Sequence, residues 1–337
     1  MAKSTPLALV QGAAALLGGA IGGWILYSRF GINHELPLEP AIDTPIERIT
    51  GKSSAASLSF YVSRPEERSM PPLVLVHSIN AAASAYEMRP IFETYRGQRD
   101  VYALDLPGFG FSKRPDVEYT PELFKQAIID LLEHIGEPAD VVALSLSCEF
   151  AASAAHQRPE LFRSLTMLSP SGFNRRDNKR ASQSAQQSGT SDFFYNLFSF
   201  PLWGRAFYDL VATRKSIHYF LQQSFEGSVD ANLDAYAYQT SHQPGAERAP
   251  LYFVSGKLFN ANILDTVYSK LTIPVLVLYD FDSFVSFDRL PDLVEQLENW
   301  HAVRIVPTRG LAQFEKMTEV AQQLDQFWTR TGIETSH

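Results

Sequence analysis

Eight short apolar runs between residues 46 and 306 constrain the fold of this chain more than any other feature of its sequence. Their length and their apolar and β-branched side chains are typical of β-strands. Segments with the apolar spacing of amphipathic helices separate them, and the clearest begins after Thr120 and ends at Gly136. Alternating strands and helices indicate βαβ units and a mainly parallel sheet, with an antiparallel pair expected from the first two strands. The predicted strands are residues 46–50, 58–62, 72–77, 100–105, 139–144, 164–169, 273–279 and 302–306.

The stretch from residue 172 to 268 interrupts this alternation, because it holds no apolar run of comparable strength. It begins with a polar segment, predicted to be a loop, and continues into the aromatic segment 193–208. An insertion between the sixth and seventh strands of a sheet is expected to form a helical cap. The aromatic residues are expected to lie in helices of the cap that cover a pocket in the core.

The amino-acid composition limits which classes of function the protein can have. A chain of 337 residues with 45% apolar residues can bury a large core. The net charge of −8 leaves no broad basic surface, so nucleic acid is excluded as an expected partner. The single cysteine, Cys148, excludes an internal disulfide and a zinc site built on several thiolates. No metal or cofactor is predicted.

The first thirty residues differ from the rest, because residues 7–27 carry no charge. A helix of this length rises about 30 Å, the thickness of the apolar core of a bilayer. The sequence therefore predicts a membrane anchor over residues 1–30, a single-pass membrane localisation, and a proline-rich linker over residues 31–43. The alternative is a signal peptide, cleaved after the small residues 18–20.

Three local motifs resemble those of the α/β-hydrolase fold family. His77 and Ser78 end the third predicted strand, where the family has a His-Gly oxyanion loop. The segment DLPGFGFS, residues 105–112, matches the family's strand-to-loop motif. Residues 143–147, ALSLS, resemble the nucleophile elbow G-x-S-x-G, with small residues in place of both glycines. The resemblance covers about residues 45–330 and implies an eight-stranded, mainly parallel sheet formed by residues 44–171 and 269–331, with the helical cap over residues 172–268 inserted after the sixth strand.

The resemblance places Ser145 on the turn between strand and helix as the candidate nucleophile. The N–H of Leu146, together with one from Ser78 or Ile79, would form the oxyanion hole. The cofactor-free dehalogenase and epoxide hydrolase relatives need an aspartate at this position, so Ser145 argues against that class.

The other half of the catalytic triad departs from the family pattern. A serine needs a base within about 3 Å, oriented in turn by a carboxylate. The family carries its acid after the seventh strand, where Asp282 is the candidate although it is one residue out of register. It carries its histidine after the eighth strand, where this chain has Gly310 or Leu311, depending on the direction of counting. Neither residue can accept a proton.

Two histidines are considered as replacements for the missing base. His77 ends the strand beside the elbow, although a structural role in holding the oxyanion loop is the simpler interpretation. His242 lies in the cap and would have to point inward to reach Ser145.

Two hypotheses follow. In the first, the protein is a membrane-anchored degenerate hydrolase that binds a lipophilic small molecule, or docks a protein partner. In the second, it is an active esterase, lipase or acyltransferase that acts on an acyl ester through Ser145, a displaced histidine and Asp282. The aromatic residues of the cap, Phe198 and Trp203 among them, favour a lipophilic ligand in either case.

Overall fold

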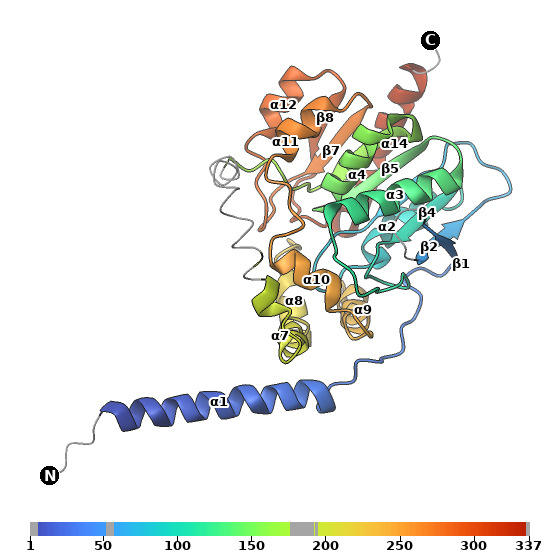
Figure 1. Ribbon diagram of the computed structural model, residues 1–337. Helices are drawn as coiled ribbons and strands as arrows, with labels where there is room; N and C mark the ends of the chain where they lie inside the picture. Colours follow the sequence, from blue (N-terminus) through green and yellow to red (C-terminus); the bar gives the residue numbers. More distant parts are fainter. Residues whose placement is uncertain (1–5, 52–56, 176–191, 193–194, 335–337) are drawn as a thin grey trace.

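The molecule is built around one eight-stranded sheet, in the order β1-β2-β4-β3-β5-β6-β7-β8 (Figure 1). The computed structural model describes residues 6–51, 57–175, 192 and 195–334. β1 and β2 are antiparallel to each other and β2 is antiparallel to β4, while every later pairing is parallel. The strands are β1 (Ile46–Thr50), β2 (Ser57–Ser63), β3 (Leu73–Val76), β4 (Val101–Asp105), β5 (Ala139–Leu144), β6 (Phe162–Leu168), β7 (Val275–Tyr279) and β8 (Trp300–Arg304).

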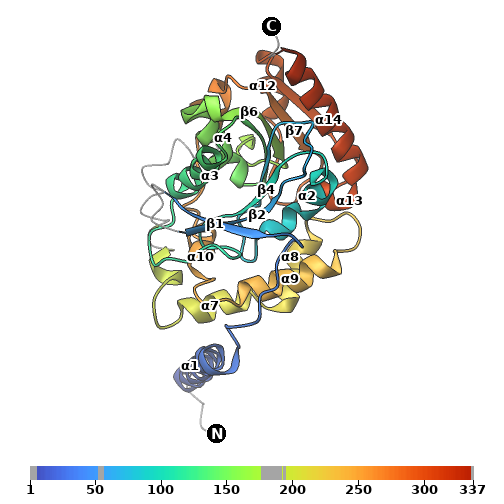
Figure 2. The same cartoon turned by 90° about the vertical axis from the view of Figure 1, so that its right-hand side faces the viewer.

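Helices cover both faces of this sheet (Figures 1 and 2). One face packs against α3 (Pro121–Ile135) and α4 (Ser147–Gln157), and the other against α2 (Arg89–Tyr95) and α14 (Met317–Glu334). All residues of β3, β4 and β5 are therefore buried, which explains why their sequences are apolar without alternation. The remaining short core elements are η1 (Ala85–Met88), η2 (Pro159–Leu161), α12 (Leu290–Gln296) and α13 (Ala312–Glu315).

The alternation of strands and helices is confirmed, and the clearest predicted helix has the predicted ends. The hydroxyl of Thr120 accepts a hydrogen bond from Leu123 N at 3.2 Å, and Gly136 closes α3 in the left-handed conformation with φ 79°. The last strand begins two residues earlier than predicted, at Trp300, because the buried Trp300 ring supplies an apolar contact that the pattern of residues 302–306 did not show.

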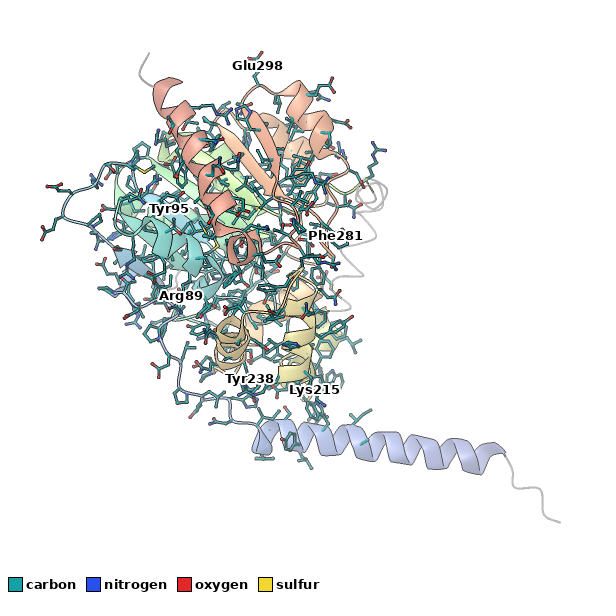
Figure 3. The ribbon with its side chains drawn as sticks, turned by 180° about the vertical axis from the view of Figure 1, so that it is seen from behind. Arg89, Tyr95, Lys215, Tyr238, Phe281 and Glu298 are labelled. Carbon is teal, nitrogen blue, oxygen red and sulfur yellow. The ribbon has the colours of Figure 1, made fainter. Side chains whose placement is uncertain are left out.

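A group of helices inserted between β6 and β7 forms a cap on the sheet (Figure 1). The predicted polar loop lies mostly outside the described residues. The elements of the insertion are α7 (Gly204–Val211), α8 (Arg214–Gln222), α9 (Ala231–Ser241), α10 (Arg248–Val254), α11 (Ile263–Thr266) and η3 (Tyr268–Lys270). Side chains of the cap, including Lys215 and Tyr238, lie between the core and the N-terminal helix (Figure 3).

The N-terminal helix α1 (Pro6–Gly31) docks on this cap. The indole N–H of Trp24 donates to Ala206 O at 2.7 Å, and the Ser28 hydroxyl donates to the buried Asp209 carboxylate at 2.6 Å. The other half of α1 extends beyond the cap (Figure 1).

The predicted membrane anchor requires a correction. Among the residues that the structure describes, no helix is long and apolar enough to cross a membrane. The C-terminal part of α1 is held to the cap by polar contacts, from Trp24 to Ala206 and from Ser28 to Asp209. The expected single-pass localisation is therefore wrong for the described chain.

Candidate active site

Ser145 occupies a strained turn between β5 and α4. Its φ is 56°, a left-handed value that non-glycine residues rarely adopt. Its N–H donates to Leu168 O at 2.8 Å and its carbonyl accepts from Cys148 N at 3.1 Å, so the backbone on both sides is held. The flanking Ala143 and Ser147 are fully buried, where larger side chains would not fit. This is the geometry of a nucleophile elbow.

Ser145 lines a cavity of about 400 Å³ between the sheet and the cap. This volume lies within the usual range for small-molecule sites, roughly 300 to 1,000 Å³. No histidine belongs to the described wall. The cavity is lined by Ser78, Ile79, Asn80, Ala81, Ala82, Glu87, Leu144, Ser145, Leu146, Ser169, Ser171, Val211, Ile217, Phe220, Leu221, Ser224, Leu233, Ala237, Phe253, Val254, Phe259, Asp282, Phe284, Val285, Gly310 and Leu311.

The three residues expected around the oxyanion hole all line this cavity, but their N–H groups are not equivalent. The N–H of Ser78 donates to Glu87 Oε2 at 2.8 Å. The N–H groups of Ile79 and Leu146 form no hydrogen bond within the described part of the chain. Ile79 and Leu146 are therefore the pair that could hold a developing oxyanion.

Glu87 is a site residue that the sequence analysis missed. Its carboxylate also accepts from Ser78 Oγ and from Asn80 Nδ2, each at 3.0 Å, and thereby fixes the loop that carries Ile79. Burial raises the pKa of this carboxyl above its ordinary value. Ser84 followed three residues later by Glu87 matches a capping pattern, which could have drawn attention to this carboxylate.

His77 also holds the oxyanion loop in place, through hydrogen bonds that involve both of its ring nitrogens. Its Nδ1 donates to Ser78 O at 2.6 Å, and its Nε2 accepts from Leu106 N at 3.0 Å. Both nitrogens are thus engaged by backbone, and the residue does not line the cavity. Burial lowers the pKa of the imidazole to about 4, so the ring is neutral at pH 7. This arrangement leaves His77 no nitrogen with which to take a proton from Ser145.

The DLPGFGFS motif is joined to this loop through Leu106 and Asp105. The Asp105 carboxylate accepts from Ala85 N at 3.1 Å and from Phe111 N at 2.9 Å. A Cβ at Gly110, where φ is 48°, would lie 2.0 Å from Asp105 Cγ, so this position requires glycine. The motif therefore positions the oxyanion loop and does not itself enter the cavity.

Asp282 lies in the cavity wall directly beside Gly310. Its Oδ1 accepts from Phe284 N at 2.7 Å and from Val285 N at 3.3 Å, and its Oδ2 accepts from Ser169 Oγ at 2.7 Å. Burial raises the pKa of this carboxyl above its ordinary value. A Cβ at Gly310 would lie 2.9 Å from Asp282 Oδ2. The structure thus brings the candidate acid, Ser145 and the two candidate histidine positions to one cavity.

Ser169 was not singled out from the sequence, although it ends a predicted strand. It follows Leu168, whose carbonyl binds Ser145 N, and its hydroxyl binds Asp282. Carboxyl ends of parallel strands share one edge of a sheet, and that rule could have indicated Ser169.

His242 lies elsewhere. It follows α9, and its Nδ1 is 2.8 Å from Tyr238 O, one turn back on the same helix. Its ring packs at a tilt against Tyr238, with centroids 4.0 Å apart, and stacks with His34 on the side of the cap where α1 docks. Burial lowers its pKa. The ring does not belong to the cavity wall.

Phe198 and Trp203 also lie away from the cavity. Phe198 stacks on Phe207, with centroids 4.4 Å apart, and the Trp203 indole N–H donates to Leu197 O at 2.7 Å. Their rings pack within the cap itself. The aromatic residues that do line the cavity are Phe220, Phe253, Phe259 and Phe284.

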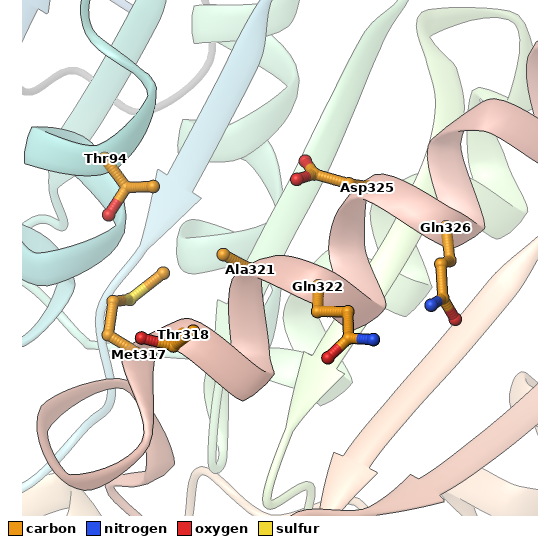
Figure 4. Close-up of a pocket in the computed structure, with 7 residues that line it drawn as sticks. All are labelled: Thr94, Met317, Thr318, Ala321, Gln322, Asp325 and Gln326. Carbon is orange, nitrogen blue, oxygen red and sulfur yellow. The ribbon is translucent and has the colours of Figure 1, made fainter.

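A second hollow lies where α14 passes Thr94 of α2 (Figure 4). It is an open surface groove, and none of the predicted site residues belongs to it. Elsewhere in the described residues, no group of three or more His, Cys, Asp or Glu side chains could hold a metal ion.

A model of the alpha/beta hydrolase family matches residues 73–323, which include the elbow, Asp282 and Gly310. The chain belongs to the alpha/beta hydrolase family. This family member is 31% identical over 137 residues to YugF, an uncharacterized hydrolase of Bacillus subtilis, a match that covers 40% of this chain and 48% of the relative. It is 29% identical over 106 residues to the 2-hydroxymuconate semialdehyde hydrolase of Pseudomonas sp. strain CF600, covering 31% of this chain and 38% of that enzyme. The matches thus span about half or less of these curated relatives.

Solved structures agree on the fold. A serine hydrolase involved in carbazole degradation superposes with a TM-score of 0.64 at 15% identity, covering 85% of this chain and 98% of that one. A bacterial membrane phospholipase A superposes with the same TM-score at 17% identity, covering 96% of both chains. At these identities the likeness extends to the fold alone.

Proposed function

We propose that this alpha/beta hydrolase family member is a degenerate serine hydrolase whose cavity binds an apolar ligand. The observation that carries the proposal is the composition of the cavity wall. Ser145 and Asp282 both face the cavity, while the family's histidine position holds Gly310 or Leu311 and no other histidine of the described wall replaces it. A serine without a base loses several orders of magnitude in rate, although the oxyanion hole and substrate binding can preserve roughly 10³ to 10⁴ over water.

The rest of the wall supports ligand binding. Most of its surface is apolar, and the cap contributes apolar side chains that include Ile217, Leu221 and Leu233. A few polar groups, among them Asn80 and Ser145, are gathered at the sheet side. An apolar pocket with a small number of polar groups at one end is typical of sites for lipophilic molecules.

The alternative is an active esterase, lipase or acyltransferase. The strained φ of Ser145 is retained, as an active nucleophile would need. The two hypotheses differ in the reactivity of a single hydroxyl, which a covalent probe measures directly.

A fluorophosphonate probe is expected to label the protein slowly or not at all, because the probe requires an activated serine. The measurement is in-gel fluorescence over time, with the Ser145→Ala variant alongside the wild type. Rapid labelling that disappears in Ser145→Ala would show an active enzyme and refute the degenerate site.

Filling part of the cavity is expected to weaken the binding of an apolar dye. Ala237 is buried on the cavity side of α9, whereas Ala235 is exposed on the same helix. Ala237→Phe should weaken binding of the neutral dye Nile red by about tenfold, since overpacking costs about 1 to 3 kcal/mol. Fluorescence titration checks this.

Ala235→Phe is the matched control and should bind the dye like the wild type. Equal binding by all three proteins would mean that the dye, and by extension an apolar ligand, does not use this cavity.

A further inference from the structure

We propose that the cavity recognises a ligand with a basic nitrogen and an apolar tail, the nitrogen binding at Asp282 in the space beside Gly310. This inference rests on the proposed function and names the chemical class of its ligand. Three features carry it: the charge of the wall, the unused hydrogen-bonding capacity of Asp282, and the separation of polar and apolar residues along the cavity.

The charge of the wall has one sign. The ionisable side chains that line the described cavity are Glu87 and Asp282, and the same lining includes no lysine, arginine or histidine. Among the charged side chains of the described lining, a ligand carboxylate would meet only other carboxylates, with no cation to offset its loss of water. A protonated amine would meet opposite charge. The electrostatics therefore favour a cationic or neutral head group over an anionic one.

Asp282 retains acceptor capacity on the side that faces Gly310. A carboxylate offers about four acceptor positions. Two are used by Phe284 N and Val285 N, both on Oδ1, and from the described part of the chain Oδ2 accepts only the Ser169 hydroxyl. Within the described residues, no ion pair involves Asp282. Oδ2 is also the oxygen nearest to the missing side chain of Gly310. An N–H group of a ligand can donate to it there.

Glu87 is a weaker candidate for the same role. Its carboxylate already accepts three hydrogen bonds from Ser78 and Asn80. It is 4% exposed, so little of it is available to a ligand. The nitrogen is therefore assigned to Asp282.

The apolar tail has a path away from this point. The cap side of the cavity is lined by Ile217, Leu221 and Leu233. Four lining side chains are large, apolar and exposed on the outside as well, which places them where the cavity opens: Phe220 at 47%, Val254 at 41%, Phe259 at 46% and Phe284 at 59%. The apolar tail of a ligand whose nitrogen binds Asp282 can thus extend under the cap in apolar surroundings.

Displacement of Nile red by three ligands with the same ten-carbon chain tests the inference. The ligands are n-decylamine, n-decanol and n-decanoate. We expect decylamine to displace the dye from the wild type at about tenfold lower concentration than decanol, since a hydrogen bond to a charged group contributes about 1.5 to 3 kcal/mol. Decanoate should be the weakest of the three.

Asp282→Asn removes the charge and should bring decylamine to the level of decanol. Asp288→Asn is the matched control, because Asp288 is an exposed aspartate of the same loop outside the cavity, and it should keep the preference for the amine. Ser169→Ala removes a donor to Asp282 and should retain that preference as well. If Asp282→Asn does not fold, these two variants and the order in which the three ligands displace the dye from the wild type still test the inference.

Equal displacement by decylamine and decanol in the wild type would overturn this inference while leaving an apolar cavity in place. Stronger displacement by decanoate would also overturn it. Failure of all three ligands to displace the dye, together with no effect of Ala237→Phe, would refute the proposed function itself.

Discussion

Replacing Leu311 by histidine is expected to raise the hydrolysis of a short-chain p-nitrophenyl ester by on the order of 10²-fold. Leu311 lines the same cavity as Asp282 and Ser145, and its backbone has φ −107°, which histidine adopts without strain. The new imidazole would supply, within this cavity, the base that the triad lacks. The release of p-nitrophenol, followed by absorbance, measures the gain.

The neighbouring position is expected to be the poorer one. Gly310 has φ 96°, a conformation that side chains rarely adopt, and any Cβ there would come within 2.9 Å of Asp282 Oδ2. Gly310→His should therefore gain less than Leu311→His. This geometry distinguishes the two registers that counting along the sequence left open.

Two control variants define what the gain means. Leu311→Gln introduces a polar side chain of similar size without a base and should gain nothing. Leu311→His combined with Ser145→Ala should lose the whole gain. If a folded Leu311→His protein is no faster than the wild type, the missing histidine is not the only defect of the site, and the oxyanion loop or the cap has diverged as well.

The His77 side chain is expected to make the stability of the protein depend on pH between about 6.5 and 4. Its pKa is 6.5 when unperturbed and about 4 in the buried site. Folding therefore favours the neutral ring, and its contribution is fully present above pH 6.5 and is lost as the pH falls toward 4. At pH 4.5 the loss amounts to about 2.5 kcal/mol in the free energy of unfolding.

Urea unfolding of the wild type and His77→Gln at several pH values isolates this contribution. Asp105, whose pKa burial raises to about 6, acts in the opposite direction, because its contribution is lost as the pH rises from 3.8 through 6. Because both proteins retain Asp105, that effect cancels in the difference between their free energies of unfolding. The wild type should lose its stability advantage over His77→Gln as the pH falls from 7 to 4.5. An advantage that stays constant over this range would contradict the assignment of His77 as a buried neutral ring.

The core of the fold could be predicted because it rests on local patterns. Strands buried on both faces are apolar throughout, and the helix between Thr120 and Gly136 carries its own start and stop signals. The N-terminal helix was predicted as a helix but misassigned as an anchor. Absence of charge over residues 7–27 is compatible with both, and the polar contact that fastens it, from Ser28 to Asp209, joins residues 181 positions apart.

The site could be predicted only in part, because local patterns reveal strand ends but not contacts between distant residues. Ser145, Leu146 and Asp282 each follow a recognisable strand end, and the structure brings all three to the cavity. The pairing of Glu87 with Ser78 depends on how the oxyanion loop folds back, which no periodic pattern encodes. Phe198 and Trp203 could not be distinguished from the aromatic residues that do line the cavity, since the side of the cap that a ring faces is decided by tertiary packing.

The attachment of α1 has a consequence for observing this molecule. Asp209 of α7 is 1% exposed and binds both Ser28 of α1 and His34, so the N-terminal helix is fastened to the insertion. A rigid-body displacement of the insertion would therefore swing α1 through a much longer arc than the residues around the cavity themselves. One dye on the exposed side of α1 and another on α14 would therefore report any displacement of the insertion relative to the sheet as a change in energy transfer.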